Sequence, residues 1–408
     1  PSLETTRHEE TSEPIRELVE LARSCQSEWL AFCRRLIQTP SLPGQEGRAA
    51  HLIREEMEKL RYDRVWVDRV GNVIGHMRGG TGKSLIFNGH MDHVDPGPED
   101  RWPHPPYAAH VDGTWLWGRG ASDMKAALAL QVYGLGLLRR VGYTLPGDCY
   151  VTAVVLEEKG GLGTRNLVRE LKADMAVVGE ATSNQIARGH RGRFEIIVRV
   201  TGRSVHASVP DRGANPHYSI ARFLTELQQL PMATDGDFGP STVVPTLYHT
   251  DQTSGNVTPG EVELYLDWRN IPRETVEDAL TKLRSILARS LQDGCRGEVE
   301  LNVTRLATYT GHEQDLPREF PSFVLPPDHT LVVDARRVLQ SALGHEVPVG
   351  MWKFATDSAH LVNAGIPTIG FSPASEQYPH TTEDRIEIEA MVEGLAGYMA
   401  LALELGRT

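Results

Sequence analysis

Two patterns of hydrophobic and polar residues follow one another along this chain, and each predicts a different kind of sheet. Up to about residue 186, short runs that are apolar throughout alternate with amphipathic stretches of helical period. Strands are predicted here at 64–67, 72–76, 84–88, 148–156 and 174–178. Helices are predicted at 14–39, 45–60, 123–141 and 163–171. Apolar strands that alternate with helices predict an α/β sheet, mixed but mainly parallel and flanked by helices.

The second pattern covers residues 187–306, where apolar residues alternate with polar ones as in strands with one exposed face. Such strands are predicted at 194–201, 241–249, 261–269 and 298–306, and helices at 215–230 and 274–291. The resulting order, β-α-β-β-α-β, predicts a small antiparallel sheet with two helices on one face.

The first pattern then returns, with helices predicted at 329–343, 357–364 and 385–405 and a strand at 368–371. We expect the last of these helices to cover the sheet. A length of 408 residues also favours two domains. The chain is therefore predicted to form a discontinuous α/β domain, 1–186 and 307–408, interrupted by an α+β domain, 187–306.

Composition and charge narrow the classes of protein that remain. Hydrophobic residues make up 40% and charged residues 24% of the chain, and no run approaches the ~20 apolar residues of a membrane span. The stretch 1–16 is polar and is expected to contain no signal-peptide core. The four cysteines lack CxxC spacing, which favours reduced thiols in the cytoplasm. A net charge of −12 argues against nucleic acid or an anionic membrane as partner.

Five residues have the side chains and positions of metal ligands: His90, Asp123, Glu158, Glu180 and His380. Asp123 is expected to open a helix after a Gly-Arg-Gly turn, and the others follow strand ends, where open α/β sheets bind ligands. Any one of them alone would more simply be a cap or a turn residue. Together they favour a zinc-type site, since imidazoles and carboxylates are ligands of zinc. One carboxylate more than a single site needs suggests two metals that share a bridging ligand.

Four segments resemble the signatures of one enzyme family. They are 89–94 (GHMDHV), 117–125 (WGRGASDMK), 157–161 (EEKGG) and 379–383 (PHTTE). The family is that of acetylornithine deacetylase, succinyl-diaminopimelate desuccinylase and glutamate carboxypeptidase, which are dinuclear zinc hydrolases. The resemblance runs from about residue 20 to 405 and is closest to the deacetylase and desuccinylase branch. It implies a zinc-hydrolase catalytic domain and an inserted lid that serves in dimerisation.

The resemblance also implies how the five ligands divide between two divalent metal ions. His90 and Glu180 would hold one zinc, Glu158 and His380 the other, and Asp123 would bridge them, followed by a cis peptide. Zinc is favoured by the ligand types, although Co²⁺ or Mn²⁺ could substitute.

Two acidic residues beside the ligands are implied to serve in catalysis. Asp92 would hydrogen-bond His90 and fix its tautomer, unless it is a plain turn aspartate. Glu157 would be the general base: it would take a proton from a dimetal-bound water, and the hydroxide would attack an amide carbonyl.

Four further residues are implied to meet the substrate. His206 would reach across a homodimer, formed through the lid, to stabilise an oxyanion; a structural histidine is the alternative. Arg269 would clamp a substrate carboxylate and Asn256 would assist, unless they form a strand-end salt bridge and a turn. Gly370, with the residues up to 373, would line the pocket with backbone amides.

Three functions are weighed on this basis. The first is a cytoplasmic amide hydrolase that removes an acyl group from an N-acyl amino acid. The second is a dipeptidase or aminopeptidase on the same metal centre, which the sequence does not separate from the first because both use the same ligands. The third, a binding or scaffold protein without catalysis, is disfavoured because every ligand and Glu157 are present.

Overall fold

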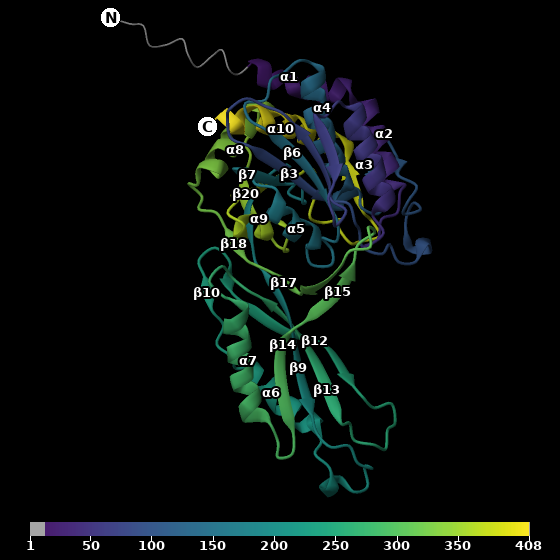
Figure 1. Cartoon of the computed structure of the whole chain (residues 1–408), viewed down its shortest axis with the longest axis vertical. Helices are drawn as coiled ribbons and strands as arrows, with labels where there is room; N and C mark the ends of the chain where they lie inside the picture. Colours follow the sequence, from purple (N-terminus) through teal and green to yellow (C-terminus); the bar gives the residue numbers. More distant parts are fainter. Residues whose placement is uncertain (1–12, 408) are drawn as a thin grey trace, which may run out of the picture. The chain divides into compact units, whose positions relative to one another are not determined.

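The computed structural model describes residues 13–407 and divides the chain into two compact units (Figure 1). Unit 2 consists of Arg191–Arg305 and Asp315–Phe323, and unit 1 contains the remainder of the described chain. Unit 2 therefore includes 315–323, a segment expected in the other domain, because β17 (Glu319–Phe320) pairs with β9 of unit 2. Residues 1–12 of the polar N-terminal stretch lie outside the described part.

Unit 1 is built on a nine-stranded sheet in the order β1-β2-β6-β3-β7-β20-β8-β18, with β19 paired to β8. Its strands are β1 (Arg64–Val67), β2 (Val73–Met77), β3 (Leu85–His90), β6 (Cys149–Val154), β7 (Met175–Val178), β8 (Ile186–His190), β18 (Phe323–Val324), β19 (Val349–Trp352) and β20 (Thr368–Gly370). The central pairs β6–β3, β3–β7 and β7–β20 are parallel, whereas β1–β2, β2–β6 and β20–β8 are antiparallel. The prediction of a mixed sheet is confirmed, and its parallel pairs lie at the centre.

Helices cover both faces of this sheet (Figure 1). They are α1 (Glu13–Ser24), α2 (Gln26–Ile37), α3 (Gly47–Lys59), α4 (Ala126–Arg140), α5 (Leu162–Glu170), α8 (Thr330–Leu343), α9 (Ser358–Asn363) and α10 (Ile388–Glu404). On β3, the ring of Phe87 packs edge-on against Tyr398 of α10, while Asn88 donates to the Thr164 hydroxyl of α5. Because neighbouring strand residues point to opposite faces, α10 and α5 lie on opposite sides of the sheet.

The helix predicted over 14–39 is two helices. The chain leaves the helix at Cys25, whose backbone lies at φ −100° and ψ 12°. The Trp29 indole donates to the carbonyl of Ala22 across this break, so a side chain replaces part of the interrupted backbone ladder.

A smaller three-stranded sheet joins two distant segments of unit 1. It has the order β21-β5-β4, from β4 (His110–Val111), β5 (Trp115–Trp117) and β21 (Arg385–Glu387). Arg385 pairs with Trp117, so the residues after His380 lie beside those before Asp123.

Unit 2 has the predicted β-α-β-β-α-β order. Its elements are β9 (Arg193–Thr201), α6 (Pro216–Leu227), β12 (Thr242–Thr250), β13 (Glu261–Arg269), α7 (Val276–Ser290) and β14 (Arg296–Leu301). The strands form an antiparallel sheet in the order β12-β13-β9-β14. Alternate strand residues form one core with the apolar faces of both helices, including Val198, Phe223, Leu266, Trp268 and Leu283. Side-chain caps by Asn215 and Thr275 begin the two helices.

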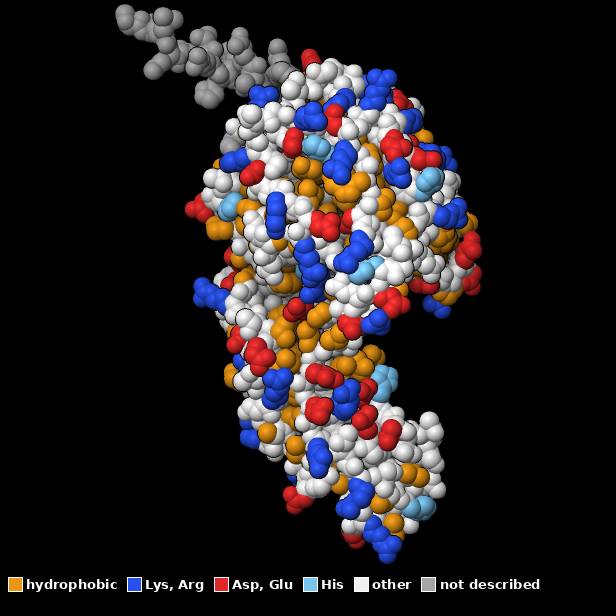
Figure 2. All heavy atoms as spheres, in the orientation of Figure 1, with side chains coloured by type: hydrophobic (Ala, Val, Ile, Leu, Met, Phe, Trp, Pro, Cys, Tyr) orange, Lys and Arg blue, Asp and Glu red, His pale blue; other side chains and the backbone are white. Residues whose placement is uncertain are grey.

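The remaining strands form short ladders: β10 (Thr234–Asp235) with β11 (Gly239–Pro240), and β15 (Val303–Ala307) with β16 (Glu313–Pro317). On the face drawn in Figure 2, acidic and basic side chains are interspersed over both units. Among residues 13–407, no helix is both long enough and apolar enough to cross a membrane.

Candidate metal centre

His90 ends β3 with its imidazole buried and its ring orientation fixed. Its Nδ1 lies 2.8 Å from the backbone carbonyl oxygen of Asp92, and since a carbonyl only accepts, Nδ1 donates. This directs Nε2 to the Asp123 carboxylate at 3.0 Å and the Glu180 carboxylate at 3.4 Å. The Asp92 carboxylate lies 3.6 Å from Nδ1, so the tautomer is fixed mainly by the Asp92 carbonyl.

Asp123 lies between two histidines. One carboxylate oxygen is 3.0 Å from His90 Nε2, and the other is 3.0 Å from His380 Nε2. The Asp123–Met124 peptide is cis. Asp123 itself has φ −138° and ψ 92°, and α4 begins only at Ala126, so the expectation that Asp123 opens a helix is wrong. The extended backbone presents a carboxylate with both oxygens toward separate imidazoles.

The five sequence-predicted ligands come together in two groups that share one residue. His90, Asp123 and Glu180 form one group, and Asp123, Glu158 and His380 form the other, with each group's ligand atoms within 4.8 Å of one another. Glu158 lies 3.0 Å from His380 Nε2. A third group at the same spacing, His90 with Glu157 and Glu158, places Glu157 at the edge of the centre.

The carboxylates of Asp123, Glu158 and Glu180 lie close together, so their negative charges repel one another. Burial and the Asp123 charge raise the pKa of Glu180 to about 7, and the same two causes raise the pKa of Glu158. Hydrogen bonds to Asp123 and Glu158 raise the pKa of His380 to about 10. The cluster thus binds positive charge strongly. Two imidazoles and three carboxylates fit two divalent cations that share Asp123.

The turn after β6 presents Glu157 and Glu158 from a fixed backbone. The fully buried Asp92 carboxylate accepts the N–H of Glu157 with one oxygen and that of Glu158 with the other, both at 3.1 Å. Burial, together with the neighbouring acids Glu180, Asp357 and Glu158, raises the pKa of Glu157 well above its usual range, against the opposing effect of His90. The backbone of Glu157 is thus fixed, and its carboxyl group lies beside the five candidate ligands, where a general base is required.

The comparison with known families decides what kind of centre this is. The model of peptidase family M20/M25/M40 matches residues 86–404. The chain belongs to this family. It is 30% identical over 397 residues to the uncharacterized protein YgeY of Escherichia coli K12, covering 96% of this chain and 97% of that protein. It is also 27% identical over 375 residues to succinyl-diaminopimelate desuccinylase of Dinoroseobacter shibae, with 88% and 94% covered.

Solved structures of other proteins share the fold. The dipeptidase Dug1p of Saccharomyces cerevisiae superposes with a TM-score of 0.76 at 12% identity, covering 98% of this chain and all of that one. Bacillus subtilis YXEP, described as a dinuclear metal-binding peptidase, gives 0.72 at 17% identity, with 95% and 99% covered. The chain is thus a metal-dependent amide hydrolase of the M20/M25/M40 family.

One residue that sequence reasoning missed holds the turn before Asp123 in this M20 hydrolase. The carboxylate of Asp384 is fully buried and accepts from the N–H groups of Gly120 and Ser122, at 2.7 and 2.8 Å. It also accepts from the Ser122 hydroxyl at 2.6 Å and from Arg119 at 3.2 Å. Asp384 therefore joins the turn before Asp123 to the segment that carries His380.

Buried Lys125, two residues after Asp123, also holds this segment in place. Its ammonium group donates to the carbonyls of Leu36 and Thr39 at 3.1 and 2.7 Å. No motif argument on the sequence assigned this lysine a role, because its partners are backbone atoms of another helix end.

Three predicted site residues lie in unit 2. His206 and Asn256 are exposed, and Arg269 lies at the end of a strand. His206 is exposed, with Nδ1 2.7 Å from the Ser208 hydroxyl, and it forms a β-bridge with Val257. The N–H of Ala207 donates to the carbonyl of Asn256 at 2.8 Å, so His206 and Asn256 lie on adjacent segments.

Arg269 ends β13. It forms the strand-end salt bridge that the sequence left open as the alternative to a substrate clamp. Its guanidinium donates to both oxygens of Asp267, at 2.6 and 3.2 Å, and Arg193 donates to the same carboxylate at 2.7 Å. The Arg269 guanidinium, which is expected to bind a substrate carboxylate, is hydrogen-bonded to Asp267 in this structure.

Gly370 ends β20 in the core of unit 1. A Cβ there would lie 2.0 Å from the Trp352 ring, so no larger residue fits. In this structure the N–H of Phe371 donates to the carbonyl of Val178, and that of Ser372 donates to the Thr182 hydroxyl.

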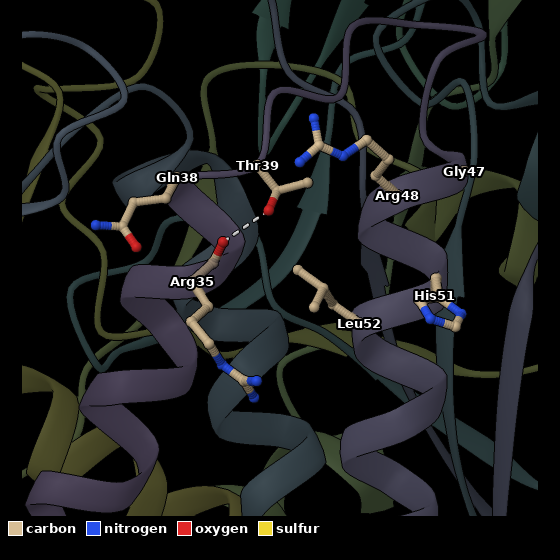
Figure 3. Close-up of a pocket in the computed structure, with 7 residues that line it drawn as sticks. All are labelled: Arg35, Gln38, Thr39, Gly47, Arg48, His51 and Leu52. Atoms are coloured by element: carbon tan, nitrogen blue, oxygen red, sulfur yellow. Dashed lines mark hydrogen bonds between the residues drawn. The ribbon is translucent and has the colours of Figure 1, made fainter.

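A separate cavity of about 540 Å³ lies between α2 and α3 (Figure 3). Its lining residues are Arg35, Gln38, Thr39, Gly47, Arg48, His51 and Leu52. None of the proposed ligands lines it.

Proposed function

We propose that this chain removes an acyl group from an N-acyl amino acid by hydrolysis of the amide bond. The observation that carries the proposal is the convergence of five ligands into two groups sharing Asp123, with Glu157 at their edge. The desuccinylase name of relatives that align over most of the chain supports an acylated substrate.

Two divalent metal ions would be held in this centre, one by His90 and Glu180 and one by Glu158 and His380, with Asp123 between them. Nitrogen and carboxylate donors favour zinc, and Co²⁺ or Mn²⁺ could replace it. When bound, such metals polarise an amide carbonyl and make water more acidic. YXEP, a dinuclear metal-binding peptidase by its description, supports the number of ions.

Glu157 would act as the general base. Its carboxylate would accept a proton from the attacking water and return it to the leaving amine. Asp92 would position it by holding its backbone N–H and that of Glu158. Asn256 and Arg269 would orient the substrate carboxylate once Arg269 exchanges Asp267 for it.

Homodimerisation through unit 2 completes the proposal. The edge strand β12 is exposed along nearly its whole length and carries Val244, Leu247 and Tyr248, which are 52%, 54% and 42% exposed. An unpaired edge with exposed apolar side chains is suited to pairing with a second copy. His206, exposed on the same unit, would then serve the partner's site as an oxyanion donor.

The cytoplasm is the proposed location. All four cysteines are free thiols, and Cys33 and Cys149 are buried apart from any partner thiol. Free thiols are typical of a reducing compartment.

A dipeptidase is the second candidate, supported by the name of the structural neighbour Dug1p. Amine release by the metal-loaded protein on N-acetyl and N-succinyl amino acids, and on unmodified dipeptides, separates the two. We expect turnover on the acylated panel alone. Turnover confined to dipeptides would replace the first function with the second.

The first prediction concerns Glu157→Ala. Because the substitution removes the proton acceptor and keeps all five ligands, we expect both metals to remain bound and kcat to fall about 10²- to 10⁴-fold. Metal content by elemental analysis and kcat on the best substrate check this. A variant that turns over near the wild-type rate would show that Glu157 is not the base.

A further inference from the structure

Glu46 is a fully buried carboxyl that the proposed mechanism leaves without a role. It lies at the start of α3, in the loop that follows α2, and its side chain is 0% exposed. It forms no ion pair with any described residue. Burying a carboxyl group costs free energy, so the contacts that it makes indicate its role.

One oxygen of Glu46 makes all of its hydrogen bonds. Oε1 accepts from the N–H of Gly44 at 3.0 Å and from the N–H of Leu156 at 3.2 Å. Oε2 has no hydrogen-bond partner among residues 13–407. Burial and the nearby Asp92 carboxylate raise the pKa of Glu46 to about 7. The hydrogen bond from Gly44 stays within the loop of Glu46, whereas the hydrogen bond from Leu156 joins Glu46 to the turn that carries Glu157.

Leu156 has an unusual backbone for its residue type. Its φ is +55°, in the left-handed region that leucine rarely adopts. Such a conformation persists only where its surroundings hold it, and it often lies at functional sites. The carbonyl of Leu156 accepts from Gly161 at 3.0 Å, and its N–H is the one held by Glu46.

Three consecutive N–H groups are therefore held by two buried carboxylates. Glu46 accepts from Leu156, and Asp92 accepts from Glu157 and Glu158. Asp92 alone would hold the second and third amides but would leave the N–H of the left-handed residue before them without an acceptor. The direction in which the Glu157 side chain leaves the backbone depends on the backbone rotation of Leu156.

We propose that Glu46 is a positioning residue for the general base, which it acts on by fixing Leu156 in the left-handed conformation. This inference rests on the proposed function, in which Glu157 moves the proton. Among the described residues, no hydrogen bond or ion pair joins Glu46 to a proposed metal ligand. Loss of Glu46 should therefore lower kcat while KM and metal content stay the same.

Glu46→Met and Glu46→Gln form the matched pair that tests this. Both side chains have nearly the length and volume of glutamate, but only glutamine keeps an oxygen that can accept from Leu156. Loss of an orienting partner typically costs about 10- to 100-fold, and we expect that loss of kcat for Glu46→Met. For Glu46→Gln we expect kcat within about threefold of wild type. In both, KM should change less than about twofold.

Glu56→Gln is the control for a purely structural role. Glu56 is also buried on α3 but accepts from Tyr133, Arg35 and Lys59, away from the turn. It should lower the melting temperature and leave kcat of the folded, metal-loaded protein unchanged. If Glu46→Met fails to fold, Glu46→Asp replaces it, because the shorter side chain withdraws the oxygen from Leu156 and keeps the carboxyl.

The outcomes separate this inference from the function on which it rests. If Glu46→Met keeps the wild-type kcat while Glu157→Ala is inactive, Glu46 has no positioning role and the function stands. Equal losses of kcat in Glu46→Met and Glu46→Gln would also overturn the inference, since glutamine retains the acceptor. An active Glu157→Ala variant would instead overturn the proposed function.

Discussion

At the scale of single residues, buried carboxylates outside the five proposed ligands hold the segments that carry those ligands. Asp384 accepts four hydrogen bonds, from Gly120, Ser122 and Arg119, and all of these donors lie in the turn before Asp123. Its own segment carries His380. A single buried side chain thus sets the distance between two proposed ligands of one metal.

Asp384→Asn should weaken metal binding. The amide nitrogen would face donors that now meet an oxygen, leaving buried N–H groups unpaired at a cost of about 1–3 kcal/mol. We expect metal affinity to fall about 10- to 100-fold and the chemical denaturation midpoint to decrease. Competition with a chelator measures the first, and Glu383→Gln, at the exposed neighbouring acid, is the control. Unchanged affinity in Asp384→Asn would mean that the turn holds its shape without this carboxylate.

The sequence names the candidate ligands that the structure brings together, whereas it does not name the residues that position them. His90 and Glu180 follow apolar strands, so residue type and location sufficed once the family motifs were recognised. Asp384 and Glu46 carry no such signal, because their partners lie 264 and 110 residues away and only folding brings them together. Arg269 was predicted as a substrate clamp because the sequence does not reveal that Asp267 occupies its fork.

At the scale of elements, hydrophobic periodicity predicted most of the helices and strands. It failed where polar residues are buried or where the chain bends within an apolar stretch. Strand β8 was missed because it contains Arg188 and His190, both buried and both in contact with other residues. The break at Cys25 was missed because both flanking helices keep the same amphipathic pattern.

Strand β12 is the element whose pattern best indicates a partner. Leu247→Lys puts a charge into the proposed pairing edge, and charged edge residues oppose strand association. We expect the variant to be monomeric at concentrations where the wild type is dimeric, with unit 2 still folded because Leu247 is 54% exposed. Sedimentation measures the mass. Thr250→Lys, at the strand end, is the control, and a wild type that is itself monomeric would contradict the prediction.

At the scale of the whole molecule, the two units carry different parts of the proposed chemistry. The ligands and Glu157 belong to unit 1, whereas His206, Asn256 and Arg269 belong to unit 2. If His206 acts on the partner's centre, one active site needs residues from two chains.

Mixing two inactive variants tests this division. His206→Ala and Glu157→Ala subunits, exchanged at equal amounts, should regain about a quarter of the wild-type activity, because half of the dimers are hybrids with one intact site each. Activity after verified subunit exchange is the measurement, and each variant alone is the control. Recovery that fails to appear would place His206 outside the partner's site.

The position of β20 in the central sheet also governs how the chain can fold during synthesis. Strands β7 and β8 follow one another in sequence but are separated in the sheet by β20, which pairs with both. The sheet therefore keeps a gap until residue 370 has left the ribosome, and the face beneath α10 stays uncovered until residues 388–404 emerge. Arg191–Arg305, a continuous segment, meets no such delay. A nascent chain stalled before residue 368 should hold a folded unit 2 beside an open, chaperone-dependent sheet.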